Sequence, residues 1–325
     1  MTVDPRIGAV VIGRNEGARL LRCLDSVLGR AAHVVYVDSG SSDGSVDAAR
    51  ARGATVVELD LDRPFTAARA RNAGLEALLA GADVDHVQFI DGDCELRAGW
   101  LETAHAFLKK ADDVAVAFGR RRERFPEASV YNRLCDWEWD TPIGESNACG
   151  GDALMRVRAL QEVGGFNPRL IAGEEPDLCV RLRGRGWRIW RLDHEMTLHD
   201  ADMTRFGQWW KRTRRAGHAF AEGAAMHGAG PSGHWRRETR KAVIWGAILP
   251  LAIVIAALAL GPAAFLAVLI YPAQILRLAI REGLDRGAWE RALFLVLGKF
   301  PEAYGVLGYW RDRLMGRRGG LIEYK

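Results

Sequence analysis

The sequence predicts an α/β domain with a mostly parallel sheet, followed by a helical region that associates with a membrane. Two observations lead to this fold class. Up to about residue 91, short apolar runs alternate with amphipathic stretches, which is typical of strand–helix units with helices on both faces of a sheet. Further along, residues 242–276 contain no charged side chain, and this segment is long enough for helices that enter a bilayer.

The elements of the expected sheet follow from the apolar runs. We expect strands at residues 7–12, 34–38, 54–59 and 86–91, with helices at 16–28, 43–52 and 66–79 between them. In the mixed segment from 96 to 200, we expect helices at 96–111 and 177–185 and strands at 114–119 and 187–192. Ligands of such sheets bind at the carboxyl ends of the strands. The polar residues at those ends are Asn15, Glu16, Asp38, Ser39, Asp91 and Asp93.

Asp91 and Asp93 follow the fourth expected strand and are separated by one glycine. Side chains two positions apart on a strand point to the same side, so both carboxylates can face one ligand. Carboxylate oxygens suit Mg²⁺ or Mn²⁺, and substrate phosphates commonly complete the coordination shell. The pair therefore predicts a divalent-metal site that holds a diphosphate. A solvated loop is the structural alternative.

The composition indicates which partners and which kinds of site the protein has. The chain has 325 residues, 49% hydrophobic residues and a net charge of +4, all ordinary for a globular protein. Basic residues crowd 211–241 and the segment after 277, which indicates a membrane surface or a polyanionic ligand. Because no nucleic-acid motif accompanies them, we expect no nucleic-acid partner. The five cysteines form no C-x-x-C pair, which argues against a disulfide framework or a zinc site and fits a reducing cytosol. We expect no signal peptide, since the first apolar run is too short for one.

The uncharged segment predicts two apolar helices, 242–260 and 263–280, because Gly261-Pro262 is a strong breaker pair. Basic residues flank both outer ends, and the turn carries no charge. By the positive-inside tendency, both ends stay on the cytoplasmic side and the hairpin is inserted in the membrane. A hairpin buried in a soluble core is the alternative.

Residues 285–325 are expected to form an amphipathic interfacial helix, kinked at Pro301, and a basic tail. Aromatic and aliphatic side chains there alternate with arginine and lysine, which is typical of helices that lie in the membrane interface. Packing of this helix against the catalytic domain is the alternative.

Five motifs follow one another along residues 7–200. They are VVIGRNE at 10–16, VDSGSSDGS at 37–45, ARNAG at 70–74, FIDGD at 89–93, and GGF at 164–166 with GEEPDL at 173–178. In their order and spacing, these motifs resemble those of the family 2 glycosyltransferases of the GT-A fold. We therefore assign residues 1–230 to a GT-A catalytic domain, 242–280 to the membrane-inserted hairpin, and 285–325 to the interfacial helix and tail.

The resemblance implies a nucleotide-sugar site at the strand ends. The residues it assigns to the donor are Asn15, Glu16, Asp38, Ser39, Arg71 and Asp91. Asp38 can accept the N–H of a uracil or an equivalent base edge, since a carboxylate is only an acceptor. Arg71 can bind the base or the diphosphate with its forked donors. Donors linked to UDP or to GDP both fit this set.

The resemblance also implies a cofactor, Mg²⁺ or Mn²⁺. Asp93 is the first expected ligand, with Asp91 and the downstream His199 as further ligands. Asp91 can contact the ribose instead, and a structural role is the alternative for His199.

Glu175 stands where the family carries its catalytic base, usually an aspartate, and Asp177 lies in the same motif. The base would take a proton from the acceptor hydroxyl as this attacks the anomeric carbon, which accelerates such reactions roughly 10²–10⁴-fold. A helix N-terminal position is the alternative role of Asp177. For the acceptor we expect Asp152, Trp210 and Arg212, with a plain turn and the membrane interface as the alternatives.

These expectations describe a metal-dependent, inverting hexosyltransferase at the cytoplasmic face of the inner membrane. The acceptor would be a lipid-linked glycan or polyprenyl lipid, in cell-envelope or exopolysaccharide synthesis. Three alternatives stay open: transfer to polyprenyl phosphate itself, as in the dolichyl-phosphate-mannose synthases, a nucleotidyltransferase, and a non-catalytic nucleotide-sugar-binding membrane protein.

Overall fold

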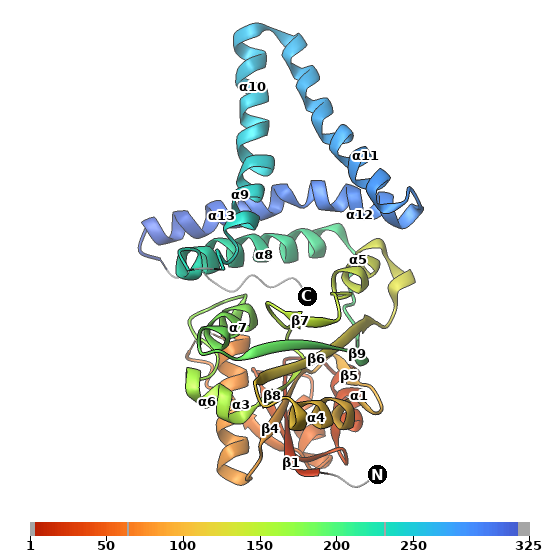
Figure 1. Ribbon diagram of the computed structural model, residues 1–325, viewed down its shortest axis with the longest axis vertical. Coiled ribbons are helices and arrows are strands. Elements are labelled where there is room, and N and C mark those ends of the chain that lie inside the picture. The colour runs from red at the N-terminus through yellow and green to blue at the C-terminus, as the bar shows by residue number, and fades with distance from the viewer. Residues whose placement is uncertain (1–3, 64, 231, 318–325) are drawn as a thin grey trace. The chain divides into compact units, whose positions relative to one another are not determined.

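The structure is a computed structural model that describes residues 4–63, 65–230 and 232–317 (Figure 1). The chain divides into two compact units, Met1–Asp202 and Met203–Lys325. The first unit contains the sheet, and the described part of the second is helical. The sequence placed the end of the catalytic domain at residue 230, whereas the two compact units divide after Asp202. The reason is that α8 (Phe206–His227) packs along α13 (Lys299–Leu314) in the second unit.

The first unit is built on a nine-stranded sheet in the order β3-β2-β1-β4-β8-β6-β9-β5, with β7 paired to β9. The strands are β1 (Asp4–Gly13), β2 (Ala31–Asp38), β3 (Thr55–Glu58), β4 (His86–Asp91), β5 (Cys94–Leu96), β6 (Val114–Glu123), β7 (Gly144–Ser146), β8 (Ala153–Arg156) and β9 (Arg188–His199). Strands β1 to β4 pair in parallel, as do β6 and β9, whereas β5, β7 and β8 pair antiparallel with their neighbours. The predicted α/β class with a mostly parallel sheet is therefore confirmed.

The helices of the first unit connect and cover these strands. They are α1 (Ala18–Val27), α2 (Ser45–Ala51), α3 (Ala67–Gly81), α4 (Trp100–Lys110), α5 (Val130–Glu138), α6 (Val157–Val163) and α7 (Glu174–Gly184), with a short 3-10 turn at Pro126–Ala128. The predicted helix at 96–111 begins only at Trp100, because residues 94–96 form β5. The strand predicted at 187–192 continues to His199.

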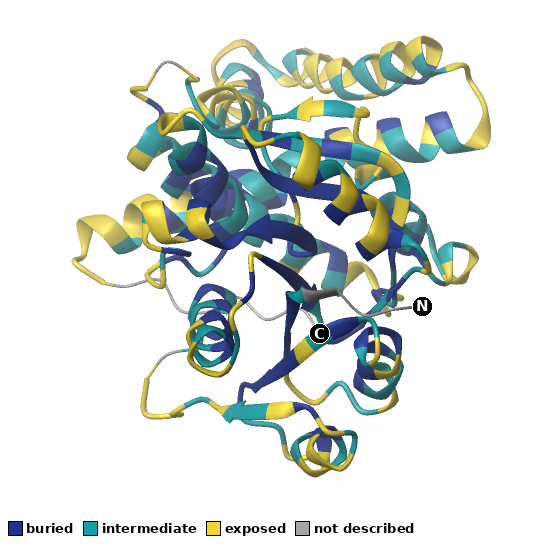
Figure 2. Cartoon of the chain, turned by 60° about the horizontal axis from the view of Figure 1, so that its bottom comes forward, coloured by how far each residue is buried: buried dark blue, intermediate teal, exposed yellow. Residues whose placement is uncertain are grey.

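Helix α3 shows how sequence dictates packing in this unit. Its N-terminus is capped by Thr66, whose hydroxyl accepts a hydrogen bond from the backbone N–H of Arg69. At Gly74 the helix lies so close to the sheet that a Cβ there would be 2.3 Å from Cγ1 of Val10 and 2.9 Å from Cγ2 of Val37. The strands beneath are buried throughout the centre of the unit (Figure 2). Glycine at position 74 therefore sets the distance between α3 and the sheet.

The register of the parallel strands aligns the ends of β1, β2 and β4. Ile12 of β1 is level with Asp91 of β4, and Gly13 is level with Asp38 of β2. The amide of Gly92 then donates a hydrogen bond of 2.8 Å to the carbonyl of Ile12. Asp38 and Asp91 therefore lie at one edge of the sheet, as the alternation of strands and helices predicted.

A second alignment brings His199 to this edge. Cys94 of β5 pairs with His199 at the end of β9, and Glu123 at the end of β6 is level with the same histidine. Since Asp93 directly precedes β5, the imidazole of His199 and the carboxylate of Asp93 become neighbours. The antiparallel pairing of β5 with β9 is what joins these distant parts of the sequence.

The second unit consists of helices. After α8 come α9 (Arg236–Val243), a π-helical turn (Ile244–Ile248), α10 (Leu249–Leu260), a 3-10 segment (Pro262–Leu269), α11 (Ile270–Glu282), α12 (Arg286–Leu297) and α13. Helices α8 and α13 touch at glycines, since a Cβ on Gly217 would be 2.1 Å from the carbonyl oxygen of Glu302. The single amphipathic helix expected within residues 285–325 is divided at Gly298 into α12 and α13. The break lies three residues before Pro301, which has no N–H to donate to the carbonyl of Leu297 at the end of α12.

Two continuous helical stretches of the second unit are apolar and long. Arg236–Leu260 has 25 residues, and its most apolar 18-residue window has a mean hydropathy of 2.7; Pro262–Glu282 has 21 residues, and its corresponding window has a mean hydropathy of 1.9. Only 11% and 6% of their most apolar windows are buried inside the protein. A hairpin buried in a soluble core would be covered by other parts of the chain, so this exposure argues against that alternative. Both helices could anchor the chain in a membrane.

Replacing Gly74 by alanine should lower the free energy of unfolding by about 1–3 kcal/mol, because the added methyl group overlaps Val10 and Val37. The matched control is Gly81→Ala, at the last residue of the same helix, where an added Cβ meets nothing within 4 Å. That control should change stability by less than about 1 kcal/mol. Urea unfolding followed by tryptophan fluorescence measures both, and equal effects would contradict the close packing of α3.

Candidate functional site

The turn after β2 forms one wall of the candidate site. The carboxylate of Asp38 is buried, and it accepts hydrogen bonds from the Tyr36 hydroxyl at 2.8 Å and from the amides of Gly40 and Ser41 at 2.9 and 2.8 Å. A carboxylate has about four acceptor positions, so one remains for a ligand. The hydroxyl of Ser39 is buried and has no hydrogen-bond partner among the described residues.

The loop after β1 is fastened to the same turn. Asn15 has a left-handed backbone (φ 55°), its amide donates to the Ser41 hydroxyl at 2.8 Å, and its side-chain oxygen accepts from the amide of Ser42 at 2.7 Å. Glu16 forms an ion pair of 3.0 Å with Arg19. The predicted donor residues of β1 and β2 therefore lie together, and Asn15 holds their two loops in place.

A buried guanidinium connects three carboxylates at the centre of the site. Arg71 of α3 is only 2% exposed. Its nitrogens lie 2.8 Å from Asp91, 2.9 Å from Glu174 and 2.9 Å from Glu175. Gly151 borders this cluster, since a Cβ there would be 2.6 Å from Arg71 and 3.2 Å from Glu175. One cation thus fixes the end of β4 and the start of α7.

The carboxyl group of Glu175 has a raised pKa. Burial and the neighbouring charge of Glu174 raise the pKa of Glu175 to about 7, even though Arg71 acts in the opposite direction. A carboxylate with a pKa near neutral exchanges protons readily at physiological pH, as a general base must. Asp177, one turn into α7, instead forms an ion pair of 2.8 Å with Arg181 along the helix.

Asp152 and Arg121 support the end of β4 from the other side. Asp152 is fully buried, and it accepts hydrogen bonds from the Asp91 amide at 3.0 Å and the Thr197 hydroxyl at 2.7 Å. Arg121 of β6 lies 3.0 Å from Asp152 and 3.7 Å from Asp91. In this structure Asp152 therefore positions Asp91, and its contact with an acceptor stays a prediction.

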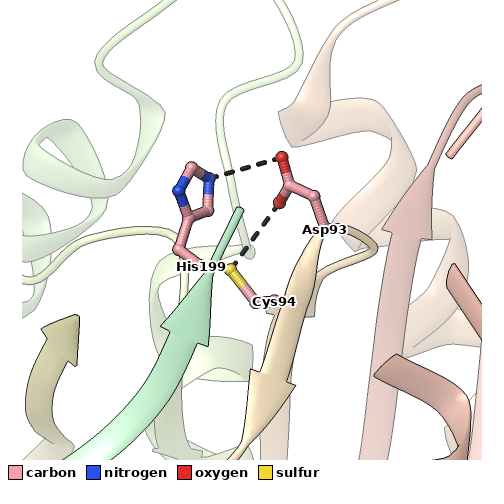
Figure 3. A group of neighbouring side chains, drawn as sticks. All are labelled: Asp93, Cys94 and His199. Carbon is pink, nitrogen blue, oxygen red and sulfur yellow. Dashed lines mark hydrogen bonds and ion pairs between the residues drawn. The ribbon is translucent and has the colours of Figure 1, made fainter. Parts of the chain in front are cut away.

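Asp93 and His199 form a second cluster beside the first, with Cys94 between them (Figure 3). Nε2 of His199 lies 3.3 Å from Oδ2 of Asp93, and the Cys94 thiol lies 3.6 Å from the other carboxylate oxygen. Potential ligand atoms of these three residues lie within 4.8 Å of one another. Asp91 belongs instead to a group with Cys94 and Asp152. Asp91 and Asp93 thus fall into different groups of potential ligands, and their coordination of one shared metal stays a prediction.

The donor atoms of this second cluster fit a divalent cation such as Mn²⁺. Asp93 offers carboxylate oxygens and His199 offers an imidazole nitrogen. Burial and nearby carboxylates, above all Asp152, raise the pKa of the Cys94 thiol well above its usual range in the metal-free protein. Sulfur ligands also suit Mn²⁺ and Mg²⁺ less well than oxygen ligands do. Asp93 and His199 are therefore the residues that could hold a metal, with the remaining positions left to a substrate and water.

Glu123 lies behind His199 and was not predicted from the sequence. Its carboxylate is buried, lies 3.6 Å from Nδ1 of His199, and accepts hydrogen bonds from the amides of Phe125 and Ala201 at 3.1 Å each. Trp139, also unpredicted, meets the other side of the imidazole edge-on with ring centres 4.8 Å apart. Nδ1 of His199 makes no hydrogen bond in the described part of the chain, so Glu123 faces the imidazole without bonding to it. A carboxylate behind a ligating histidine is a common support of metal sites.

Sequence reasoning missed Arg121, Glu123 and Trp139 for different reasons. Arg121 and Glu123 lie in the run RRRE at the end of β6. Polar residues at strand ends were the signal that identified Asp38 and Asp91, so the same signal could have identified this run. Trp139 follows α5 and gave no signal. Trp210 and Arg212, which were expected near the acceptor, lie on α8 in the second unit, where Trp210 contacts the ring of Phe206.

Comparisons with known proteins point to glycosyltransferases. Residues 9–164 match the family model described as glycosyl transferase family 2. The chain is 24% identical to glycosyltransferase AglE of Haloferax volcanii, over 66% of this chain and 72% of that protein. It is 31% identical to the succinoglycan biosynthesis protein ExoA of Rhizobium meliloti, over 50% of this chain and 52% of that protein. The alignment thus spans about half the length of ExoA.

A solved structure supports the fold. The mannosyltransferase PcManGT from Pyrobaculum calidifontis, in complex with GDP-Man and Mn²⁺, superposes with a TM-score of 0.65 at 18% identity, over 94% of this chain and 88% of that one. At this identity the likeness concerns the fold, and it confirms the GT-A-like arrangement expected from the motifs.

Replacing Arg71 by methionine should destabilise the protein by about 3–5 kcal/mol, because the carboxylates of Asp91, Glu174 and Glu175 would lose their shared buried cation. Arg69→Met is the matched control on the same helix, since the Arg69 side chain bonds to backbone carbonyls near the surface. The control should cost less than about 1 kcal/mol. Urea unfolding of both variants checks the prediction, which fails if Arg71→Met is no less stable than Arg69→Met.

Proposed function

The chain carries a family 2 glycosyltransferase domain, and we propose that it transfers a sugar with inversion from a nucleotide-sugar donor to a hydroxyl group of a lipid-linked acceptor. The observation that carries the proposal is the pair of adjacent clusters at the sheet edge. One offers a carboxylate and an imidazole to a metal, and the other presents Glu175 with a pKa of about 7. These are the two chemical elements that sugar transfer to a hydroxyl requires.

The donor would bind against the loops after β1 and β2. Asp38 retains an acceptor position for the base, and the buried hydroxyl of Ser39 faces no partner among the described residues. Asn15 and Glu16 frame the same loops, and Asp91 at the end of β4 is within reach of the ribose side of such a ligand. Donors linked to UDP or to GDP both satisfy these contacts.

Asp93 and His199 would hold Mn²⁺ or Mg²⁺, which supplies positive charge to offset the negative charge that develops on the leaving diphosphate. Glu123, 3.6 Å from Nδ1 of His199, would accept the proton of that nitrogen in a hydrogen bond when Nε2 binds the metal beside Asp93. Arg71 and Arg121 hold Asp91 and Glu175 in fixed positions, so the site needs little rearrangement when the donor binds.

Glu175 is the proposed general base. Its carboxylate would accept the proton of the acceptor hydroxyl while the oxygen forms a bond to the anomeric carbon and the bond to the diphosphate breaks. Because attack and departure occur on opposite sides of the carbon, the anomeric configuration inverts. The extra methylene of glutamate, compared with the aspartate usual in the family, places the carboxylate further from the backbone of α7.

Two lines of support favour a lipid-linked acceptor at a membrane. The apolar helices Arg236–Leu260 and Pro262–Glu282 could anchor the chain, and the basic residues at their outer ends favour the cytoplasmic face of the inner membrane. The relative ExoA is named for succinoglycan biosynthesis, which suggests a similar role in envelope or exopolysaccharide synthesis for this chain.

The proposal is tested by the release of nucleoside diphosphate from a panel of UDP-, GDP- and dTDP-sugars. The detergent-purified chain is mixed with a membrane lipid extract, with and without Mn²⁺ or Mg²⁺. We expect metal-dependent release from one donor, and loss of this release in Asp93→Ala. Nucleotide binding without release from any donor would contradict the proposal and favour a non-catalytic binding protein.

Glu175→Gln should lower the transfer rate about 10²–10⁴-fold if the acceptor is a hydroxyl, because the base is removed while the side-chain size is kept. Glu175→Asp, which restores the usual residue of the family, should retain more activity than the glutamine variant. Steady-state assays with the donor that the panel of nucleotide-sugars identifies measure the rates of both variants. Near-normal activity of Glu175→Gln would indicate that the nucleophile is already an anion, as in transfer to polyprenyl phosphate.

The rate of the wild-type enzyme should rise with pH through about 7, since Glu175 acts as a base only after it loses its proton. Below this pH the carboxyl group is protonated and kcat/KM should fall about tenfold per pH unit. The pH profile of kcat/KM at saturating metal measures this limb, and Glu175→Gln is its control because it should lack the limb. A wild-type profile without an inflection near 7 would contradict the assignment.

Glu123→Gln should weaken Mn²⁺ binding about 10–100-fold, because the imidazole of His199 loses the carboxylate behind it. Glu127→Gln is the control, since this exposed side chain follows the same strand and pairs only with Arg133 among the described residues. Electron paramagnetic resonance of free Mn²⁺ measures affinity without any turnover. Equal Mn²⁺ affinities of the two variants would show that Glu123 does not support the metal site.

A further inference from the structure

An apolar groove lies between the two long helices of the second unit. It has a volume of about 420 Å³ and is lined only by apolar and aromatic residues, among them Ile253 and Val254 of α10, Val268 and Tyr271 on the opposite side, and Leu297 and Phe300 at the base. The hydroxyl of Tyr271 donates a hydrogen bond of 2.7 Å to the carbonyl of Trp245, so the ring offers no unpaired polar group to the groove.

Each long helix is packed at its foot against α12 or α13, and the two long helices meet near their common turn and at Tyr271 and Trp245. A Cβ on Gly246 would lie 1.9 Å from the carbonyl oxygen of Lys299, so the first helix is in close contact with α13. Ala279 of α11 and Ala288 and Ala292 of α12 are all fully buried where these two helices meet. Figure 1 shows α10 and α11 separating from their common turn towards α12 and α13. Small residues thus let each long helix pack closely against α12 or α13 at its foot.

The surroundings of the groove are suited to hydrocarbon. Leu258 and Leu260 near the turn are 83% and 82% exposed, and the most apolar windows of both helices are almost entirely unburied. In a bilayer, such surfaces contact lipid chains, and a gap between the helices would be filled by a chain and not by water. The chemistry of the lining therefore selects an extended hydrocarbon.

Cations collect at the ends of the same two helices. They are Arg236, Arg237, Arg240 and Lys241 at the start of the first, and Arg277 and Arg281 near the end of the second. None of these side chains forms an ion pair with another residue in the described part of the chain. Lipids with an anionic phosphate headgroup are attracted to such uncompensated charge at a membrane surface.

We propose that this groove binds the hydrocarbon chain of one phosphate-headed lipid, and that this lipid is the carrier of the sugar acceptor. The inference rests on the proposed function, and it adds a binding site for the acceptor within the membrane unit. The long helices then have a role beyond anchoring, since they select the acceptor by its chain while the basic residues at their ends attract its phosphate.

The test uses polyprenyl phosphate as the probe, at a small fraction in phosphatidylcholine nanodiscs that contain the full chain. Val254→Trp and Val268→Trp fill the groove, whereas Ile255→Trp and Leu269→Trp place the same side chain at neighbouring positions that do not line it. Photocrosslinking to a polyprenyl phosphate analogue gives the dissociation constant of each variant. We expect the two groove variants to bind about tenfold more weakly than the wild type, and the two controls to bind as the wild type does.

Three results would overturn the proposal. Equal weakening by the groove variants and their controls would show that the groove is not the binding site. Equal competition by phosphatidylglycerol would show that it holds bulk anionic lipid, and a change of oligomeric state in the groove variants would show that a second copy of the chain covers it. If the groove binds the probe but no donor releases nucleoside diphosphate, the proposed function is wrong while the lipid site is supported.

If sugar transfer proceeds and the groove variants bind polyprenyl phosphate as the wild type does, the lipid site is wrong while the proposed function is supported.

Discussion

The buried guanidinium of Arg71 is the constraint on which the site depends. Asp91, Glu174 and Glu175 come from two distant segments, and without a cation between them their charges would repel in a setting with little solvent. With the cation in place, the end of β4 and the start of α7 are joined at fixed distances. Burial and the charge of the adjacent Glu174 raise the pKa of Glu175 towards neutrality, although Arg71 acts in the opposite direction.

Around this cluster, the topology of the sheet gives Asp91 and Asp93 different neighbours. Asp91 ends β4 and lies beside Arg71, whereas Asp93 precedes β5 and lies beside His199 because β5 pairs antiparallel with β9. We infer that the first cluster holds the substrate and the base and the second a cation. Glu123 and Trp139 flank the imidazole of the second cluster.

The parallel part of the fold was predictable because its strands are long apolar runs that alternate with helices. Strands β5, β7 and β8 have only three or four residues and lie outside the regular alternation of strands and helices that revealed the equally short β3, so the sequence could not show that β5 brings His199 to Asp93. Motif positions such as Arg71 and Glu175 could be named from sequence. Their shared ion pairs, and the support from Arg121 and Glu123, depend on register between strands and were not accessible from sequence.

We propose that Asp93 and His199 bind the metal while Arg71 keeps Asp91 and Glu175 on the substrate side. A crystal structure of the chain with Mn²⁺ and an intact nucleotide-sugar would test this arrangement. We expect an ion in contact with Asp93 and His199, and the anomeric carbon facing the carboxylate of Glu175. An ion bound between Asp91 and Asp152, or a Glu175 turned away from the sugar, would contradict it.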